Sequence, residues 1–448
     1  MPTTTNKYES YLKSFDSLER SLNGESASPI HAKRRSALAH FVELGFPTTH
    51  DEDWRFTNIL PIKNTQFQPA LRFAEEGITK AQLQHLFVTD AGSTKLVFIN
   101  GHFAESLSDI QVSMNRVTIG NLASALREGN PTIHQHLSRY AVVEKNAFVA
   151  LNTAFMLDGA FLEIGDRVTL DEPIECLFVT ASGGRSLISN PRNLFVIGKD
   201  SRATIVESYV ALDGNVCLNN VVSEFVVGEG SVVEHDKLEL EGDNSFHIGT
   251  MQIHQAARSN YTNNVISLGG HIVRNTITVV LADQYAESTL NGLSLGTGDQ
   301  LIDSHTTIDH TMPNCTSHEL YKSILDGRAK GVFNGKIFVR QDAQKTDAKQ
   351  TNKTLLLSDD ATIDTKPQLE IFADDVKCTH GAAVGQLDEE QVFYLRSRGI
   401  GERSARDILT FAFASDVVER VHTESLKMKL RDLISQRLEQ GRENREGK

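Results

Sequence analysis

Two side chains near the end of the chain, Cys378 and His380, have the type and spacing of a metal-ligand pair. They are two residues apart, so on an extended strand both would point to the same face. A thiolate and an imidazole suit iron, but two ligands do not complete a tetrahedral site. The pattern therefore predicts a site that a partner chain completes. A buried cysteine beside a capping histidine, with no bound metal, is the simpler alternative and stays open.

A second group of residues with metal-binding side chains lies upstream and consists of His305, His310, Cys315 and His318. Imidazole and thiolate groups suit iron and zinc. His305 and His310 have opposite parity, however, so on one continuous strand they would lie on opposite faces. Ordinary hydrogen-bonded polar positions are therefore the favoured interpretation, with metal ligation as the alternative.

The sequence lacks the common motifs for nucleotide hydrolysis and nucleophilic catalysis. Its nearest match to a phosphate-binding loop is GVFNGKI at 331–337, which lacks the required glycine spacing and has Ile337 where Mg²⁺ binding needs Ser or Thr. This segment is more typical of a strand, with Phe333, Ile337 and Val339 on one face. H-E-x-x-H is absent, and the single G-x-S-x-G match, GLSLG at 292–296, lies among the predicted strands and not on the strand-to-helix turn that a nucleophile elbow needs. We expect no catalytic residue in this chain, and ATP hydrolysis would require another protein.

The elements that hold these residues change in character twice along the chain. Residues 8–22 and a run that opens at Pro29 have helical spacing, and 121–156 return to it. From about Asp158 to about Val376, short Val, Ile and Thr runs alternate with Gly, Asp and Asn turns, which indicates strands. After Asp388 the helical pattern resumes. We therefore predict a mostly helical N-terminal region at 1–155, a β core at 156–377 and a C-terminal helical domain at 378–448.

The β core is predicted to be a solenoid of stacked coils. A turn followed by a small residue entering a strand recurs, for example at 165–168 and 228–232, but its spacing is irregular. Aromatic residues make up only 7% of the chain, which favours short stacked strands over a core of large rings. A sandwich or barrel remains the structural alternative. The only tryptophan, Trp54, lies among charges and predicts either a docking segment or a staple onto the domain surface.

Composition excludes several classes of function. The chain has 448 residues and a net charge of −13, which argues against a surface that tracks nucleic-acid phosphates. No apolar stretch approaches the length of a membrane helix, and the first 21 residues are too polar and acidic for a targeting signal. The four cysteines are spread widely without a C-x-x-C pair, which argues against a disulfide framework. We expect a soluble, cytoplasmic protein that binds neither nucleic acid nor membrane.

Several segments together resemble the SufB/SufD family of iron–sulfur cluster assembly proteins, and its SufD branch most closely. They are WRFTN at 54–58, GHIVRN at 270–275, DSHTTIDH at 303–310, VFNGKI at 332–337, QDAQKTDAKQ at 341–350, PQLEI at 367–371, ADDVKCTHGA at 373–382 and FYLRSRGI at 393–400. In SufB-like chains the position of Leu395 can hold an interface cysteine. Leu395 offers no thiol, which favours the SufD branch over the alternative of a SufB-type chain.

The resemblance implies a right-handed parallel β-helix flanked by helical regions, in a complex where a SufB-like paralogue and a SufC-like ABC-type ATPase are the partners. It implies that His380 and Cys378 are shared iron or cluster ligands at the paralogue interface. Iron or a cluster would bind transiently in the complex, and no cofactor would stay on this chain alone. The ATPase would dock on the helices at about 388–421, for which the candidate contacts are Phe393, Tyr394, Leu395, Arg396, Arg398, Ile408, Phe411 and Phe413.

Three alternatives remain at this stage. The isolated chain could pair with a second copy of itself instead of a paralogue. A SufB-type chain would differ in subunit identity and not in pathway. A polysaccharide-cleaving β-helix enzyme is suggested by the fold alone, and it would need a row of acidic side chains in a groove on the flank of the solenoid.

Overall fold

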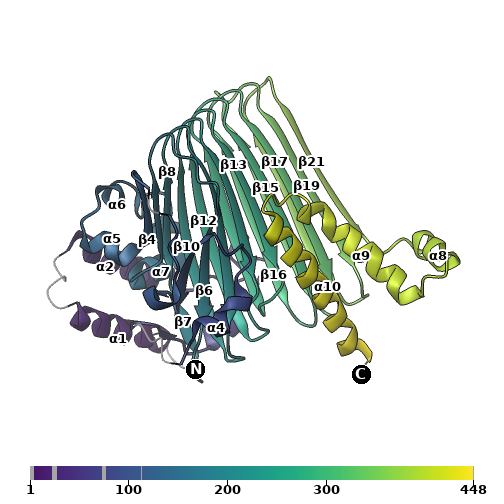
Figure 1. The fold of residues 1–448 in the computed structure, drawn as a ribbon, viewed down its shortest axis with the longest axis horizontal. Coiled ribbons are helices and arrows are strands. Elements are labelled where there is room, and N and C mark those ends of the chain that lie inside the picture. Colours follow the sequence, from purple (N-terminus) through teal and green to yellow (C-terminus); the bar gives the residue numbers. More distant parts are fainter. Residues whose placement is uncertain (1–4, 23–27, 73–76, 113, 447–448) are drawn as a thin grey trace.

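A β-solenoid forms the body of the molecule, with helices at both ends (Figure 1). The structure is a computed structural model that describes residues 5–22, 28–72, 77–112 and 114–446. Residues 1–4, the start of the segment considered above as a targeting signal, lie outside the described residues. The prediction of a mainly β solenoid flanked by helices is confirmed.

Two sheets make up the solenoid, and each coil contributes one strand to each sheet. Sheet A follows the order β20-β18-β16-β14-β12-β10-β8-β5-β4, and sheet B follows β21-β19-β17-β15-β13-β11-β9-β6-β2-β3. Every strand of the regular coils pairs in parallel with the strand two places further along the chain, for example β17 with β19 and β18 with β20. This pairing excludes the alternative of a sandwich or barrel built from antiparallel strands.

The strands lengthen from the N-terminal coils to the regular coils, where most span about ten residues. Their bounds are β1 Gln68–Pro69, β2 Thr94–Ile99, β3 His102–Phe103, β4 Val117–Asn121, β5 Ala160–Ile164, β6 Ile174–Thr180, β7 Leu187–Ser189, β8 Arg192–Ile197, β9 Arg202–Ala211, β10 Cys217–Val227, β11 Val232–Glu239, β12 Ser245–Gln255, β13 Asn260–Ser267, β14 Ile272–Leu281, β15 Glu287–Gly296, β16 Leu301–His310, β17 Thr316–Leu325, β18 Lys330–Val339, β19 Asp347–Leu356, β20 Thr362–Ile371 and β21 Lys377–Gly385.

Successive coils differ in length, which explains why the sequence shows no clean repeat. Arg202 lies opposite Val232 on the next coil, an interval of 30 residues, whereas Asn260 lies opposite Glu287 after 27 residues. The strands stay in register because the turns between them absorb the difference. A sequence repeat of fixed period is therefore not detectable, although the pairing between strands is regular.

The helices occupy both ends of the chain. Their bounds are α1 Thr5–Ser21, α2 Pro29–Leu44, α3 Leu60–Asn64, α4 Lys80–Leu83, α5 Leu122–Arg127, α6 Pro131–His136, α7 Ala147–Phe155, α8 Glu389–Ser397, α9 Glu402–Val418 and α10 Glu424–Glu446. Pro29 begins α2, as the sequence predicted, and Gly399, with a positive φ of 87°, separates α8 from α9. No described helix is both long and apolar enough to cross a membrane.

The terminal helices pack on different sheets. Near the N-terminus, α1, α2 and α7 meet sheet A through an aromatic-rich cluster that includes Phe41, Phe148 and Phe246. At the other end, α9 and α10 lie on the outer face of sheet B, where Leu430 belongs to the same apolar cluster as Leu293 (Figure 1). Among the described residues, neither helical end adds a strand beyond β20 or β21, so the edge of the last coil stays open.

The segment that contains Trp54 is a staple between the N-terminal region and sheet A. The Arg274 guanidinium lies over the indole ring, 3.8 Å from its centroid. Nearby, the Thr57 hydroxyl donates a hydrogen bond of 2.5 Å to Asp303, which also pairs with Arg274. These contacts hold the segment around Trp54 and Thr57 against the outer face of β14 and β16.

Strand pairing connects residues on both sides of each predicted domain boundary, and the boundaries themselves remain predictions. Within 1–155, β2 already pairs in parallel with β6 of sheet B. At the other boundary, the expectation that strand character ends near Val376 is wrong, because β21 pairs with β19 as far as Gly385. The small residues of 381–385 gave no alternating pattern, so only backbone pairing reveals this strand.

Candidate functional site

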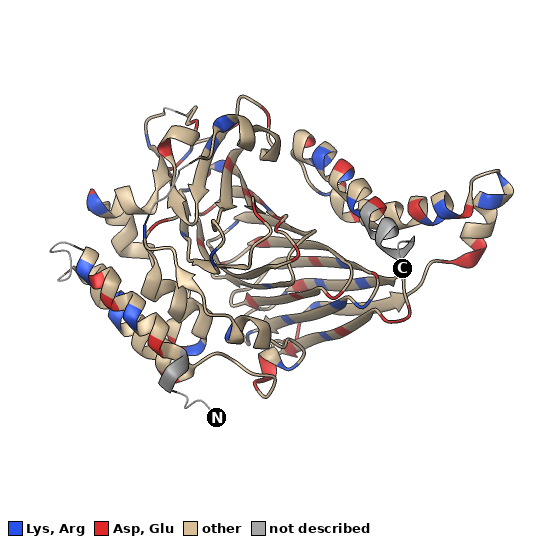
Figure 2. Cartoon of the chain, turned by 90° about the horizontal axis from the view of Figure 1, so that it is seen from below, with Lys and Arg blue, Asp and Glu red and all other residues tan. Residues whose placement is uncertain are grey.

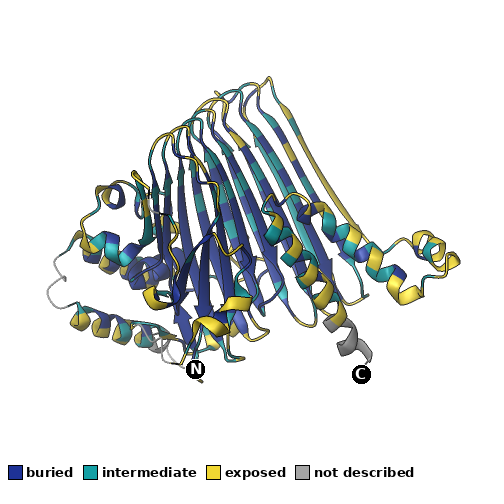
Figure 3. Cartoon of the chain, in the orientation of Figure 1, coloured by how far each residue is buried: buried dark blue, intermediate teal, exposed yellow. Residues whose placement is uncertain are grey.

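The strand β21, which carries Cys378 and His380, is the last strand of sheet B and pairs on one side only. Cys378 lies opposite Ala348 of β19, and His380 lies opposite Gln350. Ala348 and Gln350 are both buried inside the solenoid. Both candidate ligands therefore project from the inner face of the final coil, and Figure 3 shows this edge strand exposed beside buried ones. The condition that the sequence interpretation required, a strand through both residues, is met.

Cys378 is the better covered of the two side chains. It is partly buried and packs against the small apolar cluster of the last coil, which includes Ile337 and Ala373. Burial raises the pKa of its thiol, and the nearby Asp347 carboxylate adds to the effect. Cys378 therefore rests as a thiol at neutral pH, and a metal ion would have to displace its proton before the sulfur could become a ligand.

His380 is exposed at the open end of the solenoid. Its Cα lies about 7 Å along the strand from that of Cys378, as expected for residues two apart, so both side chains could reach one ion. Among the described residues, no three His, Cys, Asp or Glu side chains gather in a way that could hold a metal ion. Any metal bound by this pair would need further ligands from another molecule.

Behind His380, a row of polar side chains runs into the solenoid, and we call Glu319, Gln350 and His380 the terminal row. They occupy matching inner positions on β17, β19 and β21. Gln350 donates from Nε2 to a Glu319 carboxylate oxygen at 2.5 Å. Burial raises the pKa of Glu319 to about 7, because the hydrogen bonds that it accepts offset only part of the desolvation. Burial therefore favours the neutral, protonated form of this carboxyl group.

Further inside, a fully buried group of charged residues, here called the central cluster, comprises Lys237, Glu239, Glu241 and His247. Lys237 Nζ lies 2.8 Å from Glu239 and 2.8 Å from His247 Nε2, and His247 Nδ1 lies 2.7 Å from Glu241. Burial alone would raise the pKa of Glu239, but Lys237 and His247 outweigh it and lower that pKa to about 2. Within the central cluster, Lys237 therefore compensates the charge of Glu239.

The helices at the C-terminal end place the candidate docking residues in two settings. Phe393 and Tyr394 on α8 and Ile408 on α9 are exposed, and Arg396 and Arg398 accompany them on the surface, whereas Leu395 is half-buried. Arg side chains are interspersed with Asp and Glu along α8 and α9 (Figure 2). In contrast, Phe411 and Phe413 pack against the flank of the solenoid.

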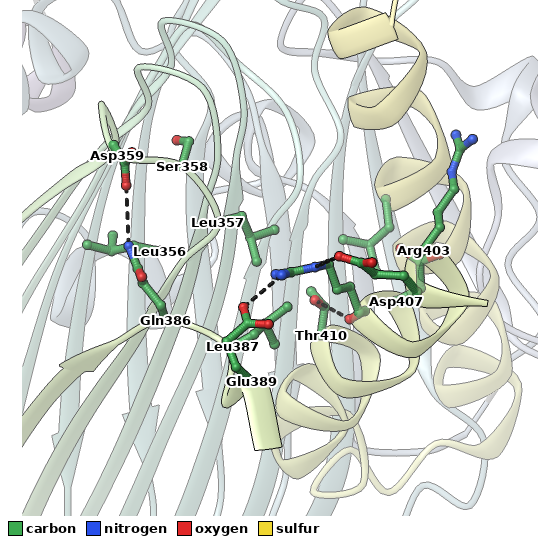
Figure 4. Close-up of a pocket in the computed structure, with 13 residues that line it drawn as sticks. Leu356, Leu357, Ser358, Asp359, Gln386, Leu387, Glu389, Arg403, Asp407 and Thr410 are labelled. Carbon is green, nitrogen blue, oxygen red and sulfur yellow. Dashed lines mark hydrogen bonds and ion pairs between the residues drawn. The ribbon is translucent and has the colours of Figure 1, made fainter. Parts of the chain in front are cut away.

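A cleft of about 580 Å³ separates the last coil from α8 and α9, and side chains of both charges line it (Figure 4). On its helical side, Arg406 Nη2 pairs with Glu389 at 2.7 Å and so ties α9 to the start of α8. The helices α8 and α9 are thus linked to each other, while α8 projects away from the solenoid (Figure 1).

Comparison with known proteins decides the family. A sequence model described as the SUF system FeS cluster assembly SufBD core domain matches residues 178–413, and the SufBD N-terminal region matches 5–176. This chain belongs to the SufBD family. An iron–sulfur cluster assembly SufBD family protein of Synechocystis is 34% identical, over 92% of both chains. The SufD proteins of Escherichia coli and Bacillus subtilis are 29% and 25% identical, over 98% and 96% of this chain and 99% and 98% of theirs. The resemblance read from the motifs is confirmed.

Within this SufBD chain, the second group of histidines and cysteine does not form a site. His305 faces outward on β16 and lies 3.0 Å from Asp303, whereas His310 points inward and lies 2.9 Å from the Ser317 hydroxyl. The Cys315 thiol donates to the backbone carbonyl of Asp283. His318 is half-buried on the outer face of β17. His305 and His310 therefore lie on opposite faces of β16, as their spacing predicted, and each has a polar partner.

Sequence reasoning missed both the central cluster and Glu319 with Gln350. Each lies in a segment that alternates charged and polar residues, such as 234–237 and 347–353, which is typical of a solvated face. The only signal available was spacing, since Glu319, Gln350 and His380 follow at intervals of 31 and 30 residues, close to one coil.

Proposed function

We propose that this chain is a non-catalytic scaffold subunit that supports de novo iron–sulfur cluster assembly at an interface with a SufB-like paralogue. The observation that carries the proposal is the position of Cys378 and His380 on β21, the unpaired edge of sheet B. An incomplete ligand pair on an edge open to another chain suits a site shared by two subunits. Iron and the nascent cluster are cargo in this scheme, and the chain retains no cofactor by itself.

The edge of the last coil supports pairing with another solenoid. Apolar side chains are exposed along it, with Phe372 at 59%, Val384 at 48% and Ile371 at 38%. An exposed strand edge with apolar neighbours is a ready template for adding another strand. The partner in the working complex is the SufB-like paralogue, and in isolation the same edge would serve a homodimer.

The second partner in this proposal is a SufC-like ABC-type ATPase, which hydrolyses the ATP. The exposed aromatic side chains of α8 support a docking surface, because Phe393 is 71% and Tyr394 55% exposed and such rings are enriched at protein interfaces. All four cysteines are free thiols, which suits a reducing compartment, and we place the complex in the cytoplasm.

The proposal is tested by purifying the chain with its SufB-like and SufC-like partners and reconstituting the mixed complex anaerobically with iron and sulfide. We expect His380→Ala to lower the yield of cluster, measured by visible absorbance and iron content. His318→Ala, on the outer face of β17, is the matched control and should behave as the unchanged chain does.

Two results would count against the proposal. Cluster formation by His380→Ala at the unchanged level would remove the role given to His380. Failure of the chain to co-purify with a separate, cysteine-richer SufB-like partner would remove the shared interface, and it would favour a SufB-type identity for this chain.

A further inference from the structure

The terminal row places one amide directly behind the candidate ligand His380. Gln350 is only 2% exposed and Glu319 3%, whereas His380 lies at the open end. All three share the inner face, and neighbouring strands of a sheet are about 4.8 Å apart. The Gln350 side chain is therefore the inner neighbour of the His380 ring.

The amide of Gln350 has one half satisfied and one half without a partner. Its Nε2 donates to a carboxyl oxygen of Glu319, as described above. Its Oε1 is buried and has no hydrogen-bond partner among the described residues. A buried acceptor without a partner is costly, so such an atom in a folded protein requires an explanation.

The surroundings keep this amide in place. Gly335 of β18 lies across the interior, and a side chain there would collide with Gln350 Nε2 and with the Phe333 ring. Glu319 therefore fixes the nitrogen of the amide toward β17 while Gly335 leaves the space that the amide occupies. Because the nitrogen is committed to the inner coil, the oxygen is left for the outer one, which carries His380.

We propose that Gln350, held by Glu319, is a positioning residue for His380: its amide oxygen accepts the N–H of the imidazole, so that the other ring nitrogen faces outward as a ligand for iron at the partner interface. Metal-bound histidines generally donate their second N–H to a carbonyl or carboxylate, which sets the tautomer and the ring orientation. This inference rests on the proposed function for the identity of the metal, but the orientation of His380 is a property of this chain alone.

A stack of amides can also serve packing without acting on a neighbour, as amide ladders do in other stacked sheets. The two roles differ in one observable. A packing role leaves the two neutral tautomers of His380 unaffected by Gln350, whereas a positioning role makes their ratio depend on it.

The test uses the full-length chain with ¹⁵N-labelled histidine, at a pH where the rings are neutral. Imidazole nitrogen shifts report the tautomer, and His380→Ala identifies the His380 signals by their loss. We expect one tautomer to dominate, and Gln350→Met, which keeps the volume but removes the amide, to change the ratio about fivefold, as for one lost hydrogen bond. Glu319→Met, which frees the amide to turn, should change it in the same direction by less.

Asn352→Leu is the matched control, because Asn352 is equally buried on the same face of β19 but lies opposite Ala382. The ratio should stay unchanged in this variant. The inference would be overturned if the tautomer ratio of His380 stayed unchanged in Gln350→Met or, should that variant not fold, in Glu319→Met. An equal change of the ratio in Asn352→Leu would also overturn it.

A second measurement separates this inference from the proposed function. In the mixed complex, with Fe²⁺ alone as the probe, Gln350→Met should weaken binding about tenfold, the usual effect of losing a partner behind a metal ligand. If the tautomer ratio responds to Gln350 but His380→Ala leaves Fe²⁺ binding unchanged, the positioning role stands and the proposed function fails.

Discussion

The central cluster and the terminal row both bury polar side chains inside one solenoid, yet they meet the cost of burial in different ways. In the central cluster, Lys237 contacts both Glu239 and His247, and the pKa of Glu239 falls to about 2. In the terminal row, Glu319 has an amide and no cation as its partner, and its pKa rises to about 7. A buried charge needs a partner of opposite sign, which Glu239 has within the chain and Glu319 does not.

The difference has a direct consequence for function. The central cluster places a cation against its carboxylate and is fully buried, so it stabilises one conformation and is closed to a ligand. A row with a buried acceptor without a partner, ending at an exposed imidazole, leaves its last hydrogen bond and its last ligand position open. The buried polar residues of the solenoid interior therefore stabilise the fold at its centre, whereas toward the edge at β21 they leave groups that could bind a ligand.

The strongest test of this contrast removes the cation from the central cluster. In Lys237→Met, Glu239 keeps its buried charge without its closest cation, and we expect the free energy of unfolding to fall by about 3–5 kcal/mol. The urea midpoint of the full-length chain measures it. Combining the substitution with Glu239→Gln removes the orphaned charge and should recover most of the loss. A double variant as unstable as Lys237→Met would show that the cluster is not charge-compensated.

The terminal row is tested by its pH dependence. The pKa of Glu319 is raised from 4.5 to about 7, so between these values the folded state holds a proton that the unfolded state has released. The free energy of unfolding therefore falls as pH rises from about 4.5 to 7, by about 3 kcal/mol from this group. Glu319→Gln has no group that titrates at this position, so its free energy of unfolding should not fall in this range. Relative to the unchanged chain, the variant should become more stable by about 3 kcal/mol between pH 4.5 and 8.

The central cluster provides the opposite control for this experiment. The pKa of Glu239 is lowered to about 2, so its contribution is fully present above pH 4.5 and is lost only as pH falls from there toward 2. Glu239→Gln should therefore alter the acid limb of the stability profile, while Glu319→Gln alters the limb up to pH 7. Parallel profiles for Glu319→Gln and the unchanged chain would mean that Glu319 is not held protonated by burial.

The contrast itself could not be predicted from the sequence, although the elements that carry it could. Helical spacing predicted the helical ends, and runs of Val, Ile and Thr predicted the strands. The inner positions escaped prediction because Lys237 and Gln350 lie in segments that are polar on both faces. Which face is buried depends on pairing with strands about 30 residues away, and coils of unequal length hide that register.

The candidate site shows the same division. The spacing of Cys378 and His380 predicted that both share one face, and it also predicted an incomplete site. That the shared face is the inner one, and that Gln350 lies behind His380, follows only from the register between β19 and β21. The strand end was placed too early, because glycine and alanine at 381–385 carry no alternation of apolar and polar residues.

The smallest expected effect concerns thiol reactivity. The reactivity of the four cysteines reports how accessible the interior and the final strand are in the unaltered chain. Cys176 and Cys217 are fully buried within the solenoid, as is Cys315, whereas Cys378 is partly exposed on the final strand. We expect a maleimide to modify one thiol per native chain, and none in Cys378→Ser, as counted by mass spectrometry. The reaction should be slower than that of a free thiol at neutral pH, because burial raises the pKa of Cys378. Cys378→Ser should cost less than about 1 kcal/mol of stability, since the side chain lies at an edge. Labelling of more than one thiol under native conditions would show that the interior of the solenoid opens to solvent. The description of the central cluster as closed would then be wrong.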